Sequence, residues 1–276
     1  MPYAENRGAR IYWEEHGEGT DLLLIQGLGY SSEMWHRTIP VLARHHRVIA
    51  FDNRGVGRSD VPAGPYPIGL MASDTAAVME AAGAARAHVF GISMGGYIAQ
   101  ELALAAPDRV RSLVLGCTSC GGPEAVLAEP EVLEKLVARA SMRAEEGIRV
   151  MIPYTYDEST PRERIEEDLA IRLRTFPTSE GYLAQLQGTT GWESCSRLAQ
   201  LTMPVLVIHG ESDRLVPPAN GRRLAAEIQG ARLLMLPQAS HIFFTDQPGV
   251  SHEAVVDFLA EVEQLRGPTG WDAARR

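Results

Sequence analysis

Short runs of hydrophobic residues alternate along the chain with longer segments in which apolar side chains recur at helical spacing. Several short runs, such as 22–25 and 205–208, are continuously apolar, which is typical of strands covered on both faces. The pattern predicts strands over 9–15, 21–25, 47–51, 87–91, 110–117, 205–210 and 232–236, and helices over 32–44, 68–82, 94–106, 217–229 and 249–265. This alternation predicts an α/β fold with a mostly parallel sheet flanked by helices.

The alternation is interrupted between residues 121 and 198. This segment has no convincing strand pattern and shows helical patterns, for example over 131–142 and 162–175. Long connections seldom lack a role, so we interpret the segment as a helical cap over the carboxyl ends of the central strands, with ordinary crossover helices as the alternative. The expected organisation is a core domain over 1–120 and 199–266, a cap over 121–198 and a loose tail over 267–276.

The composition limits the partners and the compartment. Hydrophobic residues make up 45% and charged residues 22% of the 276 positions, which excludes a wholly disordered chain. A formal net charge of −9 argues against nucleic acid or an anionic membrane as a partner. The first residues show no signal-peptide pattern, and no apolar run reaches the length of a membrane span. These features predict a soluble, cytoplasmic protein.

The cysteines Cys117, Cys120 and Cys195 are too few for a disulfide framework. We interpret them as buried or half-buried thiols in a reducing compartment. Cys117 and Cys120 have the spacing of a redox or zinc half-site, but they do not begin a helix after an early strand. We therefore expect no metal or redox site at these cysteines, and the serine chemistry described below requires no metal or organic cofactor.

The strongest chemical signal is the motif Gly91-Ile92-Ser93-Met94-Gly95, which lies between a predicted strand and a predicted helix. A strand-to-helix turn of this kind is the context of a nucleophile elbow, which presents the serine hydroxyl above the sheet. The glycines leave space for the sharp turn and for close packing of the helix on the strand. Ser93 is therefore the candidate nucleophile.

A serine hydroxyl needs a neighbouring base, and the base needs an acid to orient it, here in the chain order serine, acid, histidine. Among the eight histidines, His241 lies in a loop between the last predicted strand and the last predicted helix, where its imidazole can reach the serine. Asp213 follows the predicted strand over 205–210 and is the candidate acid. Glu211 and Asp246 are the alternatives for that role.

The negative oxygen of a tetrahedral intermediate needs hydrogen-bond donors. The elbow geometry assigns one donor to the backbone N–H of Met94, directly after the nucleophile. The second donor is expected from the loop Gln26-Gly27-Leu28-Gly29, which follows the predicted strand over 21–25. Its best candidate is the N–H of Leu28.

With these residues assembled, the sequence resembles the α/β-hydrolase superfamily over residues 8–266, and within it the group of 3-oxoadipate enol-lactonase-like lactonases and esterases. The matching motifs are Gln26-Gly27-x-Gly29, Asp52-x-Arg54-Gly55-x-Gly57-x-Ser59, Gly91-x-Ser93-x-Gly95-Gly96, Gly210-x-x-Asp213, Ser240-His241 and, for the lactonase group, Gly29-Tyr30-Ser31-Ser32-Glu33-Met34-Trp35. The resemblance implies an α/β-hydrolase fold in which 121–198 shapes an acyl or lactone pocket. One departure is Gln26-Gly27, where many members carry His-Gly.

We therefore expect a serine hydrolase that cleaves a small, fairly apolar ester or lactone through an acyl-enzyme on Ser93. A carbon–carbon bond hydrolase of ring-fission products is one alternative. A cofactor-free perhydrolase is another, although Leu28-Gly29 lacks the aromatic residue and proline of that group. A ligand receptor on the same fold is the alternative outside the enzymes. Beside Met94, the residues expected to line the pocket are Met34, Trp35, Tyr154, Phe176 and Trp192.

Overall fold

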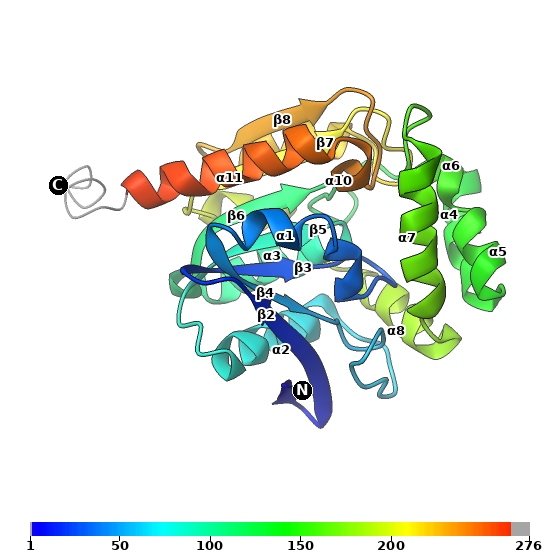
Figure 1. Ribbon diagram of the computed structural model, residues 1–276, viewed down its shortest axis with the longest axis horizontal. Coiled ribbons are helices and arrows are strands. Elements are labelled where there is room, and N and C mark those ends of the chain that lie inside the picture. Colours follow the sequence, from blue (N-terminus) through cyan, green and yellow to red (C-terminus); the bar gives the residue numbers. More distant parts are fainter. Residues whose placement is uncertain (1, 266–276) are drawn as a thin grey trace.

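The computed structural model describes residues 2–265, so the tail expected over 267–276 lies outside the described residues. The strands within them are β1 (Tyr3–Asn6), β2 (Ala9–His16), β3 (Thr20–Ile25), β4 (His46–Phe51), β5 (Ala87–Ile92), β6 (Val110–Gly116), β7 (Val205–Gly210) and β8 (Arg232–Leu236). They form one sheet in the order β1-β2-β4-β3-β5-β6-β7-β8 (Figure 1). β1 and β2 pair antiparallel, as do β2 and β4, and all other pairs are parallel. The predicted, mostly parallel sheet is confirmed.

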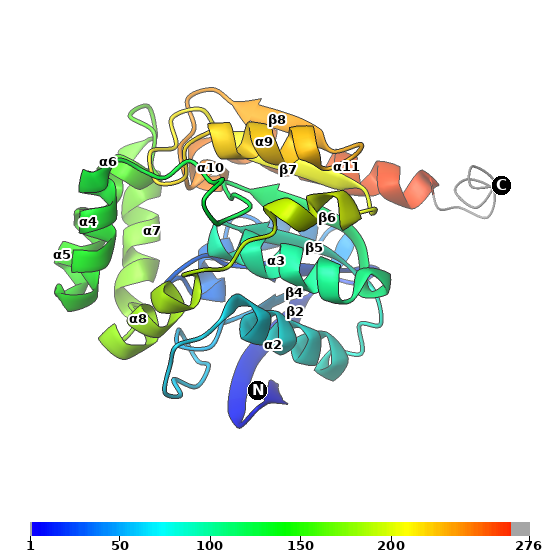
Figure 2. The same ribbon diagram turned by 180° about the vertical axis from the view of Figure 1, so that it is seen from behind.

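Helices cover both faces of this sheet. The α-helices are α1 (Ile39–Leu42), α2 (Ile68–Ala81), α3 (Met94–Ala105), α4 (Pro130–Ala138), α5 (Ala144–Arg149), α6 (Ile152–Thr155), α7 (Arg162–Arg174), α8 (Ser179–Gly188), α9 (Ala219–Glu227), α10 (Phe243–Asp246) and α11 (Pro248–Leu265). Short 3-10 helices are η1 (Ser32–Trp35), η2 (Pro107–Arg109), η3 (Arg139–Ser141) and η4 (Cys195–Gln200). α2, α3 and α9 pack on one face of the sheet, and α1, α10 and α11 pack on the other (Figure 1, Figure 2).

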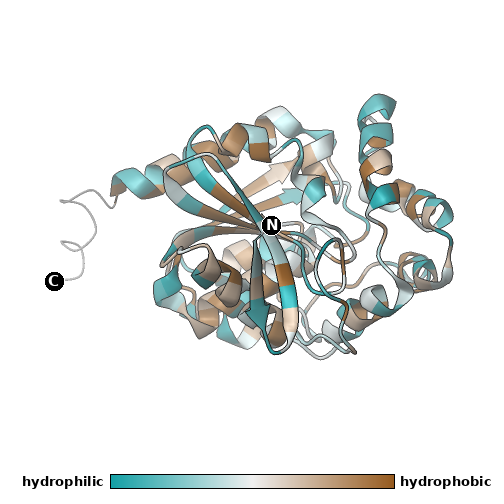
Figure 3. Cartoon of the chain, turned by 60° about the horizontal axis from the view of Figure 1, so that its bottom comes forward, coloured by the Kyte–Doolittle hydropathy of each residue, from teal (hydrophilic) through white to brown (hydrophobic). Residues whose placement is uncertain are grey.

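The continuous apolar runs supply two hydrophobic cores at once. Side chains alternate between the two faces of a strand, so Leu23 and Ile25 join the core under α2 and α3, while Leu22 and Leu24 join the core under α11. Figure 3 shows the resulting apolar stripes along the central strands, between helices that carry hydrophilic outer faces. Burial on both faces explains why these strands read as unbroken apolar sequence.

β3 and β5 are neighbours in the middle of the sheet, but the chain leaves them toward opposite faces. The connection after β3 leads to α1 on one face, and the chain passes from β5 directly into α3 on the other. When the connections from two neighbouring strands run to opposite faces of the sheet, a crevice forms between them at the carboxyl ends of the strands. Open α/β sheets bind their ligands in this crevice. The sheet order therefore places the loop after β3 beside the turn after β5.

The chain between β6 and β7 is helical, as the sequence predicts. It contains α4 to α8, and its only β contact among the described residues is an isolated bridge between Gly121 and Glu193. Figures 1 and 2 show these helices beyond the carboxyl ends of the parallel strands. Val132, Met151 and Tyr154 give the segment a small hydrophobic core of its own.

Two local elements differ from the sequence-based prediction. The prediction omits β1, which pairs with β2 through a turn in which Arg7 and Gly8 have positive φ values of 47° and 78°. Such a two-residue turn suits the twist of antiparallel strands, but a strand of four residues is too short to show a clear alternating pattern. The helix predicted over 32–44 forms instead as η1 and α1. Pro40 lies in the first turn of α1 and has no N–H with which to continue an earlier helix.

Cys120 and Cys195 form a disulfide, so their interpretation as thiols is wrong. The bond spans 75 positions and joins the chain after β6 to the first residue of η4. The sequence does not reveal this pairing because it depends on how the helical segment returns to the sheet. Cys117 is a buried free thiol, as expected. The disulfide removes the cysteine count as an argument for a reducing compartment.

Between residues 2 and 265, no helix combines the length and the apolar composition needed to cross a bilayer.

Candidate active site

Ser93 lies at the turn between β5 and α3. Its backbone has φ 55° and ψ −122°, a conformation that residues with a side chain rarely adopt. The glycines beside it are required by space: a Cβ atom on Gly91 would come within 2.2 Å of the carbonyl oxygen of Gly95, and one on Gly95 within 2.2 Å of the carbonyl oxygen of Ile25. The turn therefore has the strained, closely packed geometry of a nucleophile elbow.

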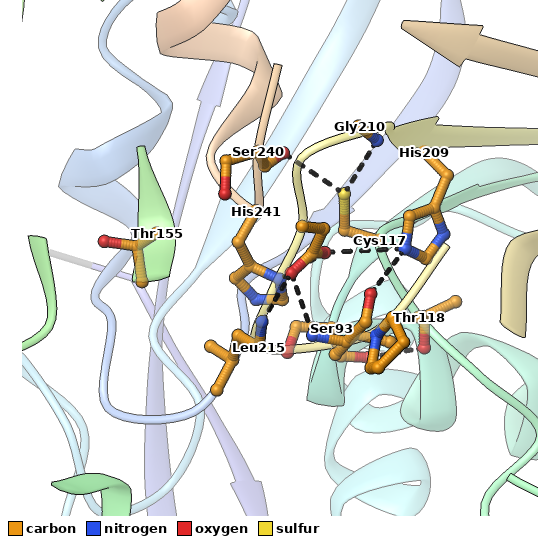
Figure 4. A network of polar contacts seen from close by, with 12 residues as sticks. Ser93, Cys117, Thr118, Thr155, His209, Gly210, Leu215, Ser240 and His241 are labelled. Carbon is orange, nitrogen blue, oxygen red and sulfur yellow. Dashed lines mark hydrogen bonds and ion pairs between the residues drawn. The ribbon is translucent and has the colours of Figure 1, made fainter. Parts of the chain in front are cut away.

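Neighbouring backbone holds this turn in place. The N–H of Ser93 donates to the carbonyl oxygen of Gly116 at 2.9 Å, and the hydroxyl of Thr118 donates to the carbonyl oxygen of Ser93 at 2.7 Å (Figure 4). Thr118 also packs against Gly96, where a Cβ atom would lie 2.5 Å from the threonine hydroxyl oxygen. Contacts to the end of β6 thus oppose relaxation of the Ser93 backbone.

His241 and Asp213 form a buried pair on the loops after β8 and β7. His241 Nδ1 lies 2.9 Å from Asp213 Oδ2, and both residues are 3% exposed (Figure 4). The other oxygen of Asp213 accepts hydrogen bonds from the N–H groups of Leu215 and Val216 at 2.9 and 2.8 Å. His209 of β7 approaches Asp213 Oδ2 to 3.4 Å from behind. The carboxylate is therefore fixed on all sides, with one oxygen directed at His241.

The electrostatic environment keeps Asp213 ionised. Burial by itself would raise the pKa of this carboxyl. The positive charge that His241 can carry, together with hydrogen bonds from His209 and His241, outweighs burial and holds the pKa of Asp213 well below its usual range. An ionised carboxylate is what a histidine needs when it becomes positively charged during a reaction.

The two alternative acids are engaged elsewhere. The side chain of Glu211 is 48% exposed and faces Arg222 at 3.9 Å. Asp246 accepts hydrogen bonds from the N–H of Ser240 at 2.7 Å and from the hydroxyl of Thr160 at 2.6 Å. Asp246 thus anchors the loop that carries His241, and burial raises its pKa to about 6.

The loop after β3 passes directly beside the elbow. A Cβ atom on Gly27 would lie 3.1 Å from the Cβ of Ser93, which is tighter than ordinary van der Waals contact, so a glycine here favours the close approach of the loop to the elbow. Gly29 donates its N–H to Gln185 Oε1 at 2.9 Å, which fixes the far end of the loop to α8. Leu28 lies between these two glycines. Met94 is the first residue of α3, and the first N–H groups of a helix have no partner within it.

The elbow, the His241 loop and the helical segment enclose a cavity of about 250 Å³. Ser93, His241, Leu28 and Met94 all line it. The structure therefore brings the sequence-predicted nucleophile, base and oxyanion donors around one space, with Asp213 behind the imidazole.

The residues expected to shape the pocket are divided by the structure. Met34 lines the cavity, whereas Trp35, Tyr154, Phe176 and Trp192 are not among the lining residues. These four side chains contact other residues: Trp35 packs against Phe90 and Phe244, Tyr154 donates a hydrogen bond to Glu131, Phe176 lies beside the Arg139 guanidinium, and Trp192 stacks on Tyr97.

One group of side chains has the composition of a metal site. Potential ligand atoms of Cys117, His209 and Asp213 lie within 4.8 Å of one another. Burial and the nearby Asp213 carboxylate raise the pKa of the Cys117 thiol, whereas a metal needs the thiolate. His209 Nε2 contacts the carbonyl oxygen of Val216 at 2.8 Å, so it carries the proton and cannot ligate from that atom. The donor set does not fit a metal ion in this arrangement.

Sequence reasoning missed three residues that contact this site. Gln185 and Arg139 lie in the segment over 121–198, where no motif marks individual positions. Gln185 holds the loop after β3, and Arg139 lines the cavity. His209 lies within an apolar strand run, and its only signal is its position four residues before Asp213.

The fold and the site together define an α/β hydrolase. The alpha/beta hydrolase fold family matches residues 21–248, so the chain belongs to this family, and the resemblance seen in its motifs is confirmed. The protein is therefore a hydrolase.

Similar proteins show how varied the family is around this chain. It is 35% identical over 267 residues to the "Putative carbamate hydrolase RutD" of Azorhizobium caulinodans, with 96% of this chain and 100% of that protein covered. It is 30% identical to the "Putative non-heme bromoperoxidase BpoC" of Mycobacterium tuberculosis, with 92% and 98% covered. The solved enol-lactonase from Burkholderia xenovorans superposes with a TM-score of 0.84 at 30% identity, over 94% of this chain and 100% of that one.

Proposed function

We propose that this hydrolase cleaves a carboxylic ester or lactone through an acyl-enzyme on Ser93. The observation that carries the proposal is the buried Asp213–His241 pair, joined at 2.9 Å, beside the cavity that Ser93 also lines. An ionised Asp213 accepts a hydrogen bond from the Nδ1–H of His241, which leaves Nε2 of the neutral imidazole as the basic nitrogen. That nitrogen is the one a serine nucleophile needs.

In the first half-reaction, His241 Nε2 takes the hydroxyl proton as Ser93 Oγ attacks the substrate carbonyl. The negative oxygen that forms accepts hydrogen bonds from the N–H groups of Leu28 and Met94. When this intermediate collapses, His241 returns the proton to the leaving alkoxide and the ester C–O bond breaks. The acyl group remains bonded to Ser93 Oγ.

In the second half-reaction, water takes the place of the alcohol. His241 accepts a proton from the water as it attacks the acyl carbonyl, and the same oxyanion donors act again. The proton then passes to Ser93 Oγ, which leaves and is restored as a hydroxyl. With a lactone, the leaving alcohol stays tethered to the acyl group, so one hydroxy acid is the only product.

The segment over 121–198 acts in this proposal as a cap that selects the substrate. Leu133, Leu136 and Met151 of this segment line the cavity opposite the sheet, and they offer apolar contacts to a small acyl group. Similarity to a protein named enol-lactonase over nearly the whole chain supports a lactone as the substrate.

The test compares the wild type with Ser93→Ala on a panel of lactones and of methyl and p-nitrophenyl esters. We expect Ser93→Ala to lose roughly three or more orders of magnitude in kcat without a change in Tm. A fluorophosphonate probe should add to the wild type and not to Ser93→Ala, as read by intact mass spectrometry. Ser119→Ala is the matched control, because Ser119 also lines the cavity and its loss should leave labelling intact. Full turnover in Ser93→Ala would remove the proposal.

A carbamate is the second candidate substrate. It is favoured by the 35% identity to a relative named as a carbamate hydrolase. Attack by Ser93 on a carbamate carbonyl follows the same steps and leaves a carbamoyl group on the serine. Faster turnover of p-nitrophenyl carbamates than of the matching carboxylic esters would favour this candidate over the first.

A further inference from the structure

Arg139 is a buried cation in the wall of the cavity that contains Ser93. It begins η3, directly after α4, and is only 3% exposed. Within the described residues, the cavity lining contains no aspartate or glutamate, and Arg139 is its only arginine or lysine. The cavity therefore has one permanent positive charge and no carboxylate of its own to balance it.

The protein does not neutralise this charge elsewhere. Among residues 2–265, no ion pair joins Arg139 to a carboxylate, and its buried Nε has no hydrogen-bond partner. Arg54, another buried arginine, shows the usual solution, because its guanidinium contacts both oxygens of Asp74. A buried guanidinium without a carboxylate partner lowers the stability of the folded protein. Its presence in the cavity wall therefore points to a ligand whose anionic group pairs with it.

Aromatic rings hold the guanidinium in position. The carbon at its centre lies 5.6 Å from the ring centre of Tyr30, 5.3 Å from that of Phe176 and 5.0 Å from that of Tyr182. Gly147 of α5 permits this packing, since a Cβ atom there would lie 3.1 Å from both Arg139 Cγ and Phe176. The faces of the rings attract the cation, and the hydroxyl of Tyr182 offers it a hydrogen bond, but none of these groups is a carboxylate that would neutralise its charge.

Burial and a second buried cation nearby add to the unfavourable energy of the Arg139 charge, which a bound anion would relieve. Burial lowers the pKa of the Arg139 guanidinium, and the nearby positive charge of Arg172 acts in the same direction. Arg172 is itself buried, and its Nη1 donates to the hydroxyl of Tyr156 at 3.4 Å. Arg172 is not part of the cavity lining, so Arg139 is the cation that a ligand beside Ser93 would meet.

We propose that Arg139 binds a carboxylate of the substrate, so that the preferred ester or lactone carries a free acid group away from the bond that is cleaved. One unpaired guanidinium matches one monoanionic group, and its planar fork matches the two oxygens of a carboxylate. The proposal rests on the proposed function, which it narrows from small apolar esters to anionic ones. The apolar lining contacts the carbon chain between the two carbonyl groups.

The experiment uses substrate pairs that differ only in charge. The anionic members are the monomethyl esters of succinic, glutaric and adipic acid, and each neutral partner has the free acid replaced by a primary amide. For the length that fits, we expect the wild type to favour the anionic ester in kcat/KM by about ten- to a hundredfold. Arg139→Met should lower kcat/KM for the anionic ester far more than for its amide partner and thereby abolish this preference. Arg139→Lys, which keeps the charge without the fork, should retain part of it.

Two controls separate binding from folding. Arg143→Met removes an exposed arginine of the same segment and should leave the preference intact. Arg139→Met should keep or raise the Tm of the free protein, because an apolar side chain replaces an unpaired buried charge. A purely structural Arg139 would instead give a lower Tm and equal losses on both members of each pair.

The outcomes also separate this proposal from the proposed function. A preference for the anionic esters that survives in Arg139→Met, or a wild type that treats both members alike, overturns the role of Arg139. If neither kind of ester is hydrolysed, the proposed function has failed, and calorimetric titration with glutarate decides Arg139 separately. Binding that weakens about tenfold or more in Arg139→Met supports the site. Equal binding, or none to the wild type, overturns it.

Discussion

Gln185 Oε1 accepts a hydrogen bond from the backbone N–H of Gly29 at 2.9 Å, across 156 positions of the chain. The Nε2 of the same side chain donates to the carbonyl oxygen of Arg54 at 2.7 Å. One amide on α8 therefore ties together the loops after β3 and β4. Because Leu28 directly precedes Gly29, the helical segment controls where the proposed oxyanion donor lies.

Removing this amide should impair catalysis more than substrate binding. In Gln185→Ala, the N–H of Gly29 and the carbonyl of Arg54 lose their partners, and the loop that carries Leu28 is free to shift. We expect kcat to fall by about tenfold or more with a smaller change in KM, since an oxyanion donor acts mainly in the transition state. Gln187→Ala, an exposed glutamine of the same helix, is the control for steady-state kinetics. Equal effects of the two substitutions would contradict the coupling.

Replacing Asp213 with Asn should disable the base while keeping the shape of the site. An amide can donate to His241 Nδ1 and thereby stabilise the tautomer whose Nε2 carries the proton. We expect kcat to fall by roughly a thousand- to ten-thousandfold, measured against the ester or lactone that the panel identifies. Glu211→Gln, at the end of the same strand, should leave kcat near the wild-type value. A greater loss of kcat in Glu211→Gln than in Asp213→Asn would assign the role of the acid to Glu211.

The pH dependence of stability should carry the signature of His252 on α11. Burial, aided by the charge of Arg37, lowers the pKa of His252 from 6.5 to about 4. Between these values the unfolded chain binds a proton that the folded protein does not, so the free energy of unfolding rises with pH, by at most about 1.4 kcal/mol per pH unit. This contribution is complete above pH 6.5 and is lost as the pH falls toward 4.

The variant His252→Gln tests this sign. His252 Nε2 lies 3.0 Å from the hydroxyl of Thr38, and a glutamine can keep a polar contact there without titrating. Urea denaturation at several pH values should show a shallower loss of stability toward low pH in His252→Gln than in the wild type. His16→Gln, a half-exposed histidine, should keep the wild-type slope. Parallel slopes for wild type and His252→Gln would show that His252 does not contribute.

Reduction of the Cys120–Cys195 disulfide should destabilise the protein. The bond closes 75 positions of chain and so restricts the unfolded state. We expect a reductant to lower the free energy of unfolding by about 2–4 kcal/mol, read as a lower Tm. The double variant Cys120→Ser, Cys195→Ser should start from the lower Tm and show no further response. Titration of three thiols in the denatured, unreduced protein would contradict the bond.

The candidate site is easiest to predict from the sequence where the chemistry fixes both residue type and spacing. Ser93 could be predicted because a nucleophile elbow requires glycines on a strand-to-helix turn. His241 could be predicted because it follows the last predicted strand. Asp213 could be predicted because it follows the strand over 205–210, which lies between Ser93 and His241 in the sequence. These positions depend on local geometry and on the order of strands, both of which leave marks in the sequence.

The features that could not be predicted from the sequence depend on how the segment over 121–198 packs against the sheet. Arg139, Gln185 and the Cys120–Cys195 bond all involve this segment, and no periodic pattern shows which side of a cap helix faces the cavity. The aromatic residues Trp35 and Trp192 were expected in the pocket because they are large and apolar. They lie in packing contacts instead, since a hydrophobic core attracts the same residue types as a binding site.

The close contact of Gly95 with the backbone of Ile25 means that the elbow tolerates substitution far less than the segment over 121–198 does. Where a Cβ atom would lie 2.2 Å from a carbonyl oxygen, no substitution can be tried without moving the sheet itself. Leu133 and Leu136 lie on α4 and Met151 directly precedes α6, all outside the sheet, where a change of side chain costs only local repacking. A laboratory selection for a new substrate should therefore accumulate its mutations on these helices and leave the elbow as it is, so that specificity diverges while the chemistry is inherited.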